Sequence, residues 1–175
     1  MEMLVKTIVA NYILEGIYFY SGFMFFYNLG RNQLMPGSVQ EIRYINRDES
    51  THLWLFRNIL IELKKEQPDL FTEQYIDEYR SMIKEGCEQE IKWGHYVIGD
   101  DVQGLNGEMI TDYVQYLGNL RCTNLGFAPI YEGHETEPES MRWVSQYSNA
   151  NAIKTDFFEA RSTAYAKSSA LVDDL

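Results

Sequence analysis

The segment RDESTH, residues 47–52, brings together side chains that can bind a metal ion or move a proton. Glu49 and His52 are three residues apart, so on a helix their side chains lie on one face about one turn apart. Asp48 adjoins the pair and could orient an imidazole by accepting a hydrogen bond from it. A carboxylate buried in an apolar stretch is costly unless a cation, a metal or a tight hydrogen bond compensates its charge. Metal binding is therefore a specific hypothesis for this segment.

A further acid, Glu15, lies in the middle of a strongly apolar stretch. Its apolar neighbours are Tyr12, Ile13, Leu14, Ile17, Phe19 and Phe23. Helical bundles that hold two carboxylate-bound metals take a lone Glu from some helices and Glu-x-x-His from others. Glu15, Glu49 and His52 are thus candidate metal ligands, and such a carboxylate-rich set favours iron or manganese over structural zinc. On the motif alone, a chance Glu-x-x-His on an exposed helix remains the alternative.

Several stretches of the chain carry the apolar periodicity of helices. They cover about residues 3–29, 36–66, 70–98 and 106–125, with a short helical turn around 139–147. No sustained two-residue alternation bounded by turn residues is present, so strands are not expected. The sequence therefore predicts an all-α protein, with a helical bundle over residues 1–147 and a flexible C-terminal tail over residues 148–175.

The first apolar stretch, residues 4–29, is long enough to span a bilayer. Lys6, Asn11 and Glu15 interrupt it, and an acid near the centre of a membrane span is costly. A helix that is apolar nearly all round and carries one acid is more typical of the middle of a helical bundle. We therefore expect no membrane span here.

The composition narrows the class of protein further. The chain has 175 residues and 45% hydrophobic content, which suits one domain with a sizeable core. Its net charge is -11 and Lys and Arg form no long block, which argues against a nucleic-acid interface. The two cysteines, Cys87 and Cys122, are too few for a disulfide framework, so a reducing cytoplasm is the expected location.

Longer motifs add a specific resemblance. NYILEGIYFYSGF, followed by RNQLMPGSVQEIRYINRDESTH, resembles the second half of the small (beta), radical-generating subunit of class I ribonucleotide reductase, a ferritin-like helical bundle. GEMITDYVQYLGNLRCTNLGFAPIY resembles a later helix of that family and the loop that follows it. The resemblance implies that Glu15, Glu49 and His52 are ligands of a dinuclear metal centre, Fe/Fe or Mn/Fe. It also implies that Asp48 hydrogen-bonds a metal-bound His and joins the radical-transfer path.

The resemblance extends to an apolar wall and to the tail. Phe19, Phe23 and Ile45 match the family's apolar lining of the metal pocket. In FFEARSTAY, Glu159 and Tyr165 match the tail Glu and the relay Tyr of the family. The implied activity is that of a ribonucleoside-diphosphate reductase small-subunit fragment, which serves deoxyribonucleotide synthesis. The tail would dock on the large catalytic subunit, and the small subunits would form a dimer.

The sequence lacks the other half of the family's ligand set. It contains no second Glu-x-x-His, and His95 and His134 are interpreted as surface residues. Three explanations are open: a split subunit whose N-terminal half is a separate chain, a homodimeric di-metal carboxylate oxidase, and a metal-free structural remnant. The split subunit is favoured, because Asp48 and the Glu159–Tyr165 tail have a use only where a full radical path exists. The chain is then expected to be active only with partner chains.

Overall fold

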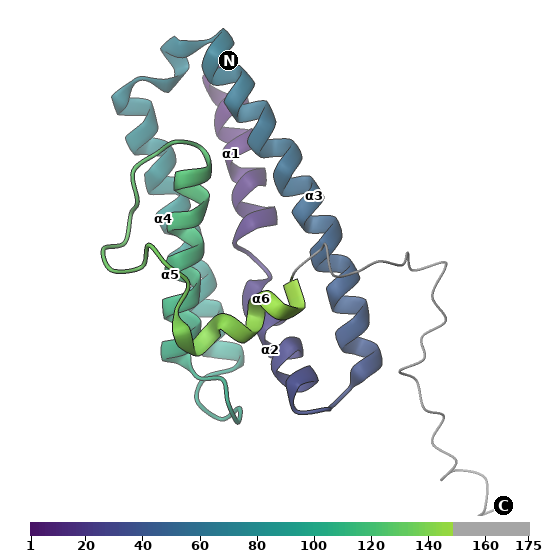
Figure 1. The fold of residues 1–175 in the computed structure, drawn as a ribbon. Coiled ribbons are helices and arrows are strands. Elements are labelled where there is room, and N and C mark those ends of the chain that lie inside the picture. The colour runs from purple at the N-terminus through teal and green to yellow at the C-terminus, as the bar shows by residue number, and fades with distance from the viewer. Residues whose placement is uncertain (149–175) are drawn as a thin grey trace, which may run out of the picture.

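The computed structural model describes residues 1–148; residues 149–175 lie outside the described part of the chain. Its elements, in order, are α1 (Glu2–Gly16), α2 (Tyr20–Arg31), α3 (Pro36–Glu66), the 3-10 helix η1 (Pro68–Phe71), α4 (Glu73–Val97), α5 (Gly107–Asn124), the 3-10 helix η2 (Glu139–Met141) and α6 (Arg142–Ser148) (Figure 1). Residues 1–148 contain no β-strand, only an isolated bridge between Val102 and Leu105. The predicted all-α class is confirmed.

Local sequence signals explain where two of the longer helices begin and end. Pro36 is the first residue of α3, a position where the missing amide hydrogen of proline costs no intrahelical bond. Asn106 caps α5, because its side chain accepts a hydrogen bond from the Met109 amide at 2.9 Å. Beyond α5, Gly126 takes a left-handed conformation (φ +72°), which glycine adopts without steric penalty. The predicted helices over 36–66 and 106–125 therefore agree with the structure.

The long helices pack side by side around one core. α1 lies along α3 and also contacts α4, while α4 lies along α5 (Figure 1). α6 crosses one end of the bundle, where it contacts α2 and α3. Burying the apolar faces of these helices is the main favourable term for folding. The largest fully buried side chains of the core are Tyr12, Tyr27, Tyr79, Ile17, Met24 and Leu60.

The expectation of one continuous helix over residues 3–29 is wrong. α1 ends at Gly16 and α2 begins at Tyr20, with Phe19 between them in a left-handed conformation (φ +73°). The carbonyl of Ile13 accepts hydrogen bonds from two successive amides, at 2.9 Å from Ile17 N and 3.4 Å from Tyr18 N. The backbone thus leaves the regular helical path over three residues that contain neither glycine nor proline. Side chains from α4 and α5 contact the helix ends at this break.

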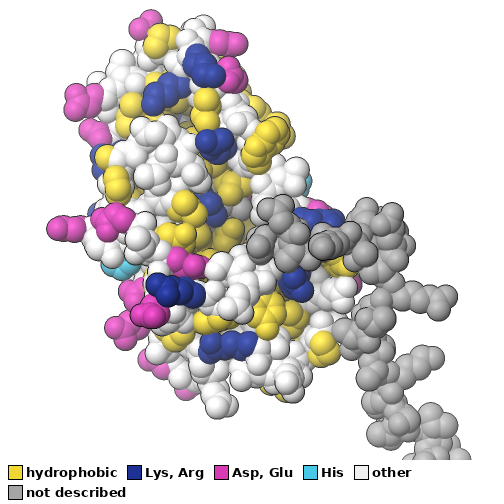
Figure 2. Space-filling view, in the orientation of Figure 1, with side chains coloured by type: hydrophobic (Ala, Val, Ile, Leu, Met, Phe, Trp, Pro, Cys, Tyr) yellow, Lys and Arg dark blue, Asp and Glu magenta, His cyan; other side chains and the backbone are white. Residues whose placement is uncertain are grey.

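The membrane expectation concerned the same stretch of chain. Among residues 1–148, no helix combines the length and the apolar character that crossing a bilayer requires. Figure 2 shows one face of the molecule, on which Lys and Arg side chains are scattered among acidic and apolar ones and do not gather in one patch.

Candidate metal centre

Three predicted ligands lie together where α1 meets α3. Glu15 is in the last turn of α1, and Glu49 and His52 are one turn apart on α3. Each residue offers one ligand atom, and these atoms all lie within 4.8 Å of one another. His52 Nδ1 is 2.9 Å from Glu49 Oε2 and 3.6 Å from Glu15 Oε2. Two neighbouring helices therefore turn two carboxylates and one imidazole nitrogen toward a common point.

The site is closed on the carboxylate side and open on the imidazole side. The side chains of Glu15 and Glu49 are only 16% and 22% exposed, whereas that of His52 is 53% exposed. Acids that are largely shielded from water and lie this close repel each other unless a proton or a cation is shared between them. The cluster therefore favours a bound positive charge, and it leaves one side free for further ligands.

The protonation of the cluster follows from this crowding. Burial raises the pKa of Glu15, and the hydrogen bond and negative charge of Glu49 raise it further. Conversely, the hydrogen bond with Glu15 lowers the pKa of Glu49, and the bond to His52 adds to that effect. The hydrogen bond to Glu49 raises the pKa of His52. Without a metal, Glu15 and His52 therefore hold their protons more tightly than such groups usually do.

The donor set fits one half of a dinuclear centre. Carboxylate oxygens with an imidazole nitrogen suit iron or manganese better than the sulfur-rich set of a structural zinc site. A di-metal carboxylate site in a bundle uses a Glu from each of two helices and a Glu-x-x-His from each of two others. Glu15 supplies one such Glu, and Glu49 with His52 supplies one such pair. The ligand role of these residues stays a prediction that the geometry supports.

An apolar groove of about 720 Å³ adjoins the cluster. Its lining residues are Leu14, Tyr18, Phe19, Gly22, Phe23, Phe26, Ile42, Ile45, Glu49, Gln89, Glu90 and Trp93. The predicted apolar wall of Phe19, Phe23 and Ile45 is thus beside Glu49. Phe23 is buried, whereas Phe19 and Ile45 are exposed, so part of this wall is open to solvent.

Asp48 lies on the exposed surface of α3. Its Oδ1 accepts hydrogen bonds from Nε and Nη2 of Arg47, both at 3.3 Å. The hydrogen bond that the structure gives to His52 joins its Nδ1 to Glu49, so the orienting role of Asp48 stays a prediction. Its exposed carboxylate stays a candidate partner for a histidine from outside this chain. The other predicted functional residues, Glu159 and Tyr165, lie outside the described residues.

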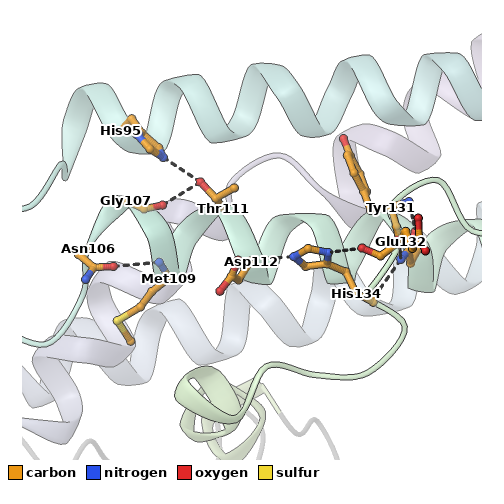
Figure 3. A network of polar contacts seen from close by, with 10 residues as sticks. His95, Asn106, Gly107, Met109, Thr111, Asp112, Tyr131, Glu132 and His134 are labelled. Atoms are coloured by element: carbon orange, nitrogen blue, oxygen red, sulfur yellow. Dashed lines mark hydrogen bonds and ion pairs between the residues drawn. The ribbon is translucent and has the colours of Figure 1, made fainter.

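The two remaining histidines do not join the cluster. Figure 3 shows both of them with their own polar contacts. His95 is exposed, as predicted, and its Nε2 lies 2.9 Å from the Thr111 hydroxyl of α5. His134 is half-buried, not freely exposed, with its Nε2 3.5 Å from Asp112. Among residues 1–148, Glu15, Glu49 and His52 are the one group of three or more His, Cys, Asp and Glu side chains close enough to share a metal ion.

Reasoning from the sequence missed the contribution of α4. Gln89, Glu90 and Trp93 line the groove, but their segment resembles the polar face of an ordinary surface helix. One signal was available: Gly86 and Gly94 lie one turn before and one turn after Glu90. Small residues at this spacing indicate that another chain segment approaches the helix closely.

Known proteins of one family match this chain over most of its length. The family model "Ribonucleotide reductase, small chain" matches residues 1–138. The chain is 75% identical over 172 residues to ribonucleoside-diphosphate reductase subunit beta of Treponema pallidum (strain Nichols), covering 98% of this chain and 49% of that protein. It is 42% identical over 165 residues to the corresponding protein of Halalkalibacterium halodurans, covering 94% of this chain and 47% of that protein.

A solved structure shows the same fold. The ribonucleotide reductase R2 subunit from Clostridium botulinum superposes with a TM-score of 0.76 at 49% identity, over 81% of this chain and 44% of that chain. The predicted ferritin-like helical fold is thereby confirmed. The chain spans about half the length of the curated relatives that it matches. On the family match and these identities, the chain belongs to the ribonucleotide reductase small-chain family.

Proposed function

We propose that this chain supplies half of a dinuclear metal site in a ribonucleoside-diphosphate reductase small subunit and so serves deoxyribonucleotide synthesis. One observation carries the proposal. In a chain of this family, the ligand atoms of Glu15, Glu49 and His52 come from two helices and lie within 4.8 Å of one another. Partly buried acids that lie this close are unfavourable without a compensating cation, so a metal-binding role explains why they are there.

The chain's own residues have distinct tasks in this function. When bound, a pair of Fe/Fe or Mn/Fe ions supplies one-electron oxidising chemistry with oxygen, which the protein scaffold does not provide. Glu15 and Glu49 hold the cations through carboxylate oxygens, and His52 does so through Nδ1, the nitrogen that faces both acids. Phe19, Phe23 and Ile45 exclude water on the groove side once the groove is covered.

The other half of the ligand set comes from polypeptide outside these 175 residues. The cluster provides one of the two Glu-x-x-His pairs that such sites use, and the apolar groove beside it is open. The relatives are about twice as long as the matched chain. We assign the missing ligands to a separate chain that carries the N-terminal half of the small subunit, and we expect the completed subunits to form a dimer.

The tail and Asp48 belong to the same proposal. Asp48 accepts a hydrogen bond from a metal-bound histidine of the partner half, at the start of the radical-transfer path. Glu159 and Tyr165 relay the radical to the large catalytic subunit, on which residues 148–175 dock. The buried, free thiols of Cys87 and Cys122 fit a cytoplasmic location, where thiols stay reduced.

Co-expression with a candidate N-terminal-half chain tests the proposal. Metal analysis and electron paramagnetic resonance are expected to show weak metal binding by this chain alone and stoichiometric binding by the pair. Equal metal content with and without the partner speaks against a split site. A metal-loaded homodimer of this chain indicates the di-metal oxidase alternative, and a stable dimer without metal in every preparation indicates the structural remnant.

A further inference from the structure

Two buried side chains of opposite charge hold the break between α1 and α2. Glu90 of α4 is 3% exposed, and Arg121 of α5 is 5% exposed. Neither forms a salt bridge with a side chain of the described residues 1–148, although a buried charge without compensation is strongly unfavourable. Each is instead directed at a helix end beside the break. The Glu15 ligand lies one residue before the last residue of α1.

Arg121 binds the C-terminal end of α1. Its Nε donates a hydrogen bond of 2.8 Å to the carbonyl of Gly16, the last residue of that helix. Its Nη2 donates a hydrogen bond of 3.2 Å to the hydroxyl of Tyr20. Tyr20 is the first residue of α2. A helix C-terminus carries partial negative charge and unpaired carbonyls, so a guanidinium there is favourable. A Cβ at Gly16 would lie 2.8 Å from Arg121 Nε, so only glycine leaves room for this contact.

Glu90 binds the N-terminal end of α2. One of its carboxylate oxygens accepts a hydrogen bond of 2.8 Å from the Ser21 amide, in the first turn of that helix. The amides of a first helical turn have no intrahelical acceptor and carry partial positive charge, so a carboxylate compensates them. On the preceding residue of α4, the Gln89 side chain accepts a 2.6 Å hydrogen bond from the Tyr18 hydroxyl.

Close packing brings α4 against the break. A Cβ at Gly86 would lie 2.5 Å from Ile13 Cγ2 of α1, and a Cβ at Gly94 would lie 2.7 Å from Ser21 Oγ of α2. Gly86 therefore contacts the helix before the break, and Gly94 contacts the helix after it. Glu90, one turn from each, is placed at the break itself.

We propose that Glu90 and Arg121 are positioning residues of the metal centre, which fix the α1–α2 break and thereby the placement of the Glu15 ligand. This inference rests on the proposed metal-binding function. The site at which α1 ends decides where the Glu15 carboxylate meets α3, and Arg121 holds the carbonyl of the adjacent residue. The start of α2 sets the position of Phe19 in the groove wall, and Glu90 holds that start.

The test uses two substitutions of Glu90 in the 175-residue chain. Glu90→Leu removes the acceptor, whereas Glu90→Gln keeps an oxygen that can accept the Ser21 amide bond. Glu88→Leu is the matched control, because Glu88 is exposed on the same helix, two residues away. Two measurements are made: amide hydrogen exchange of residues 17–23 without metal, and titration with Co(II) followed by its visible absorption spectrum.

In Glu90→Leu, we expect faster exchange over residues 17–23 with unchanged exchange in α5. The Co(II) dissociation constant is expected to rise by about tenfold, the size typical of outer-shell substitutions, with a shifted Co(II) spectrum. Glu90→Gln is expected to recover most of the affinity and the wild-type spectrum, and Glu88→Leu to match wild type. If Glu90→Leu does not fold, Arg121→Lys takes its place and is expected to shift the Co(II) spectrum in the same way.

The outcomes separate this inference from the proposed function. If Glu90→Leu binds Co(II) with the affinity and the spectrum of the wild type, the positioning role alone is overturned. This holds whether or not amide hydrogen exchange over residues 17–23 is faster. Absence of any Co(II) binding by the wild-type chain, both alone and together with the N-terminal-half chain, removes the metal centre and the positioning role together.

Discussion

His52 Nδ1 lies 3.6 Å from Glu15 Oε2, although the two residues belong to different helices. The same nitrogen is 2.9 Å from Glu49 Oε2, so one imidazole faces both acids. A chance Glu-x-x-His on an exposed helix does not explain this approach, because it leaves out the partly buried acid on α1.

Removing one ligand is expected to remove most of the metal affinity of the chain. Glu49→Ala or His52→Ala leaves two donors where three lie within 4.8 Å, and we expect the Mn(II) or Fe(II) dissociation constant to rise by about 100-fold or more. Glu62→Ala is the control, since Glu62 is an exposed acid on the same helix. Calorimetric titration measures the affinities, and equal values for Glu49→Ala and Glu62→Ala contradict the ligand assignment.

Metal affinity is expected to fall as the pH is lowered from about 8 to about 6. Burial and the nearby Glu49 raise the pKa of Glu15, and the bond to Glu49 raises the pKa of His52. Both groups therefore hold their protons to a higher pH than usual, and a metal must displace them. Titrations at several pH values measure the slope, which is expected to be shallower in His52→Ala.

The stability of the metal-free chain is expected to change in the opposite direction. Because the folded-state pKa of His52 is raised, its pairing with Glu49 stabilises the fold fully below the ordinary histidine pKa of about 6.5. That contribution is lost as the pH rises through the raised value. Urea unfolding at pH 5.5 and pH 8 is expected to show a wild-type advantage over His52→Ala at the lower pH only.

Gly94→Ala is expected to destabilise the chain by about 1–3 kcal/mol. The new methyl group would lie 2.7 Å from Ser21 Oγ and 2.8 Å from Ile110 Cγ2, so these side chains or α4 itself must shift. Gly22→Ala is the matched control, because nothing lies within 4 Å of a Cβ at that helical position. It is expected to stabilise by about 0.5–1 kcal/mol. Chemical denaturation compares the two, and similar effects at both positions would show that α4 does not approach the break closely.

Ile45→Lys is expected to weaken association with the N-terminal-half chain by about 1–3 kcal/mol without unfolding this chain. Ile45 is an exposed apolar residue of the groove wall next to the metal cluster, and a docked helix would bury it. Tyr96→Lys is the control, because Tyr96 is exposed but does not line the groove. Sedimentation analysis of the mixed chains measures association. Equal weakening by both substitutions argues against docking in the groove.

Tyr165→Phe is expected to abolish nucleotide reduction and to leave metal assembly intact. Removing the phenolic hydroxyl interrupts the proposed proton-coupled relay without touching the ligands, which lie far away in the sequence. Turnover assays with the large subunit, together with metal analysis, separate the two effects. Tyr96→Phe is the control, and surviving turnover in Tyr165→Phe shows that the relay assignment is wrong.

The sequence alone determined the helices after residue 35 and the local part of the candidate site. Apolar periodicity and the signals at Pro36, Asn106 and Gly126 define helix positions through interactions between near neighbours. The Glu49–His52 pair follows from the same local geometry, because residues three apart share one face of any helix. Glu15 was a candidate ligand as the lone acid of an apolar stretch, and the resemblance carried by the longer motifs supported it.

The tertiary structure decided the rest. A continuous helix over residues 3–29 satisfies local propensity, and nothing in residues 17–19 requires a break. The break forms because Glu90 and Arg121, from helices far along the chain, compensate the two helix ends that it exposes. Glu15 meets His52 for a similar reason, since the packing of α1 against α3 sets their distance. Such contacts depend on the free energy of burying charges and apolar faces between distant segments, which local sequence patterns do not encode.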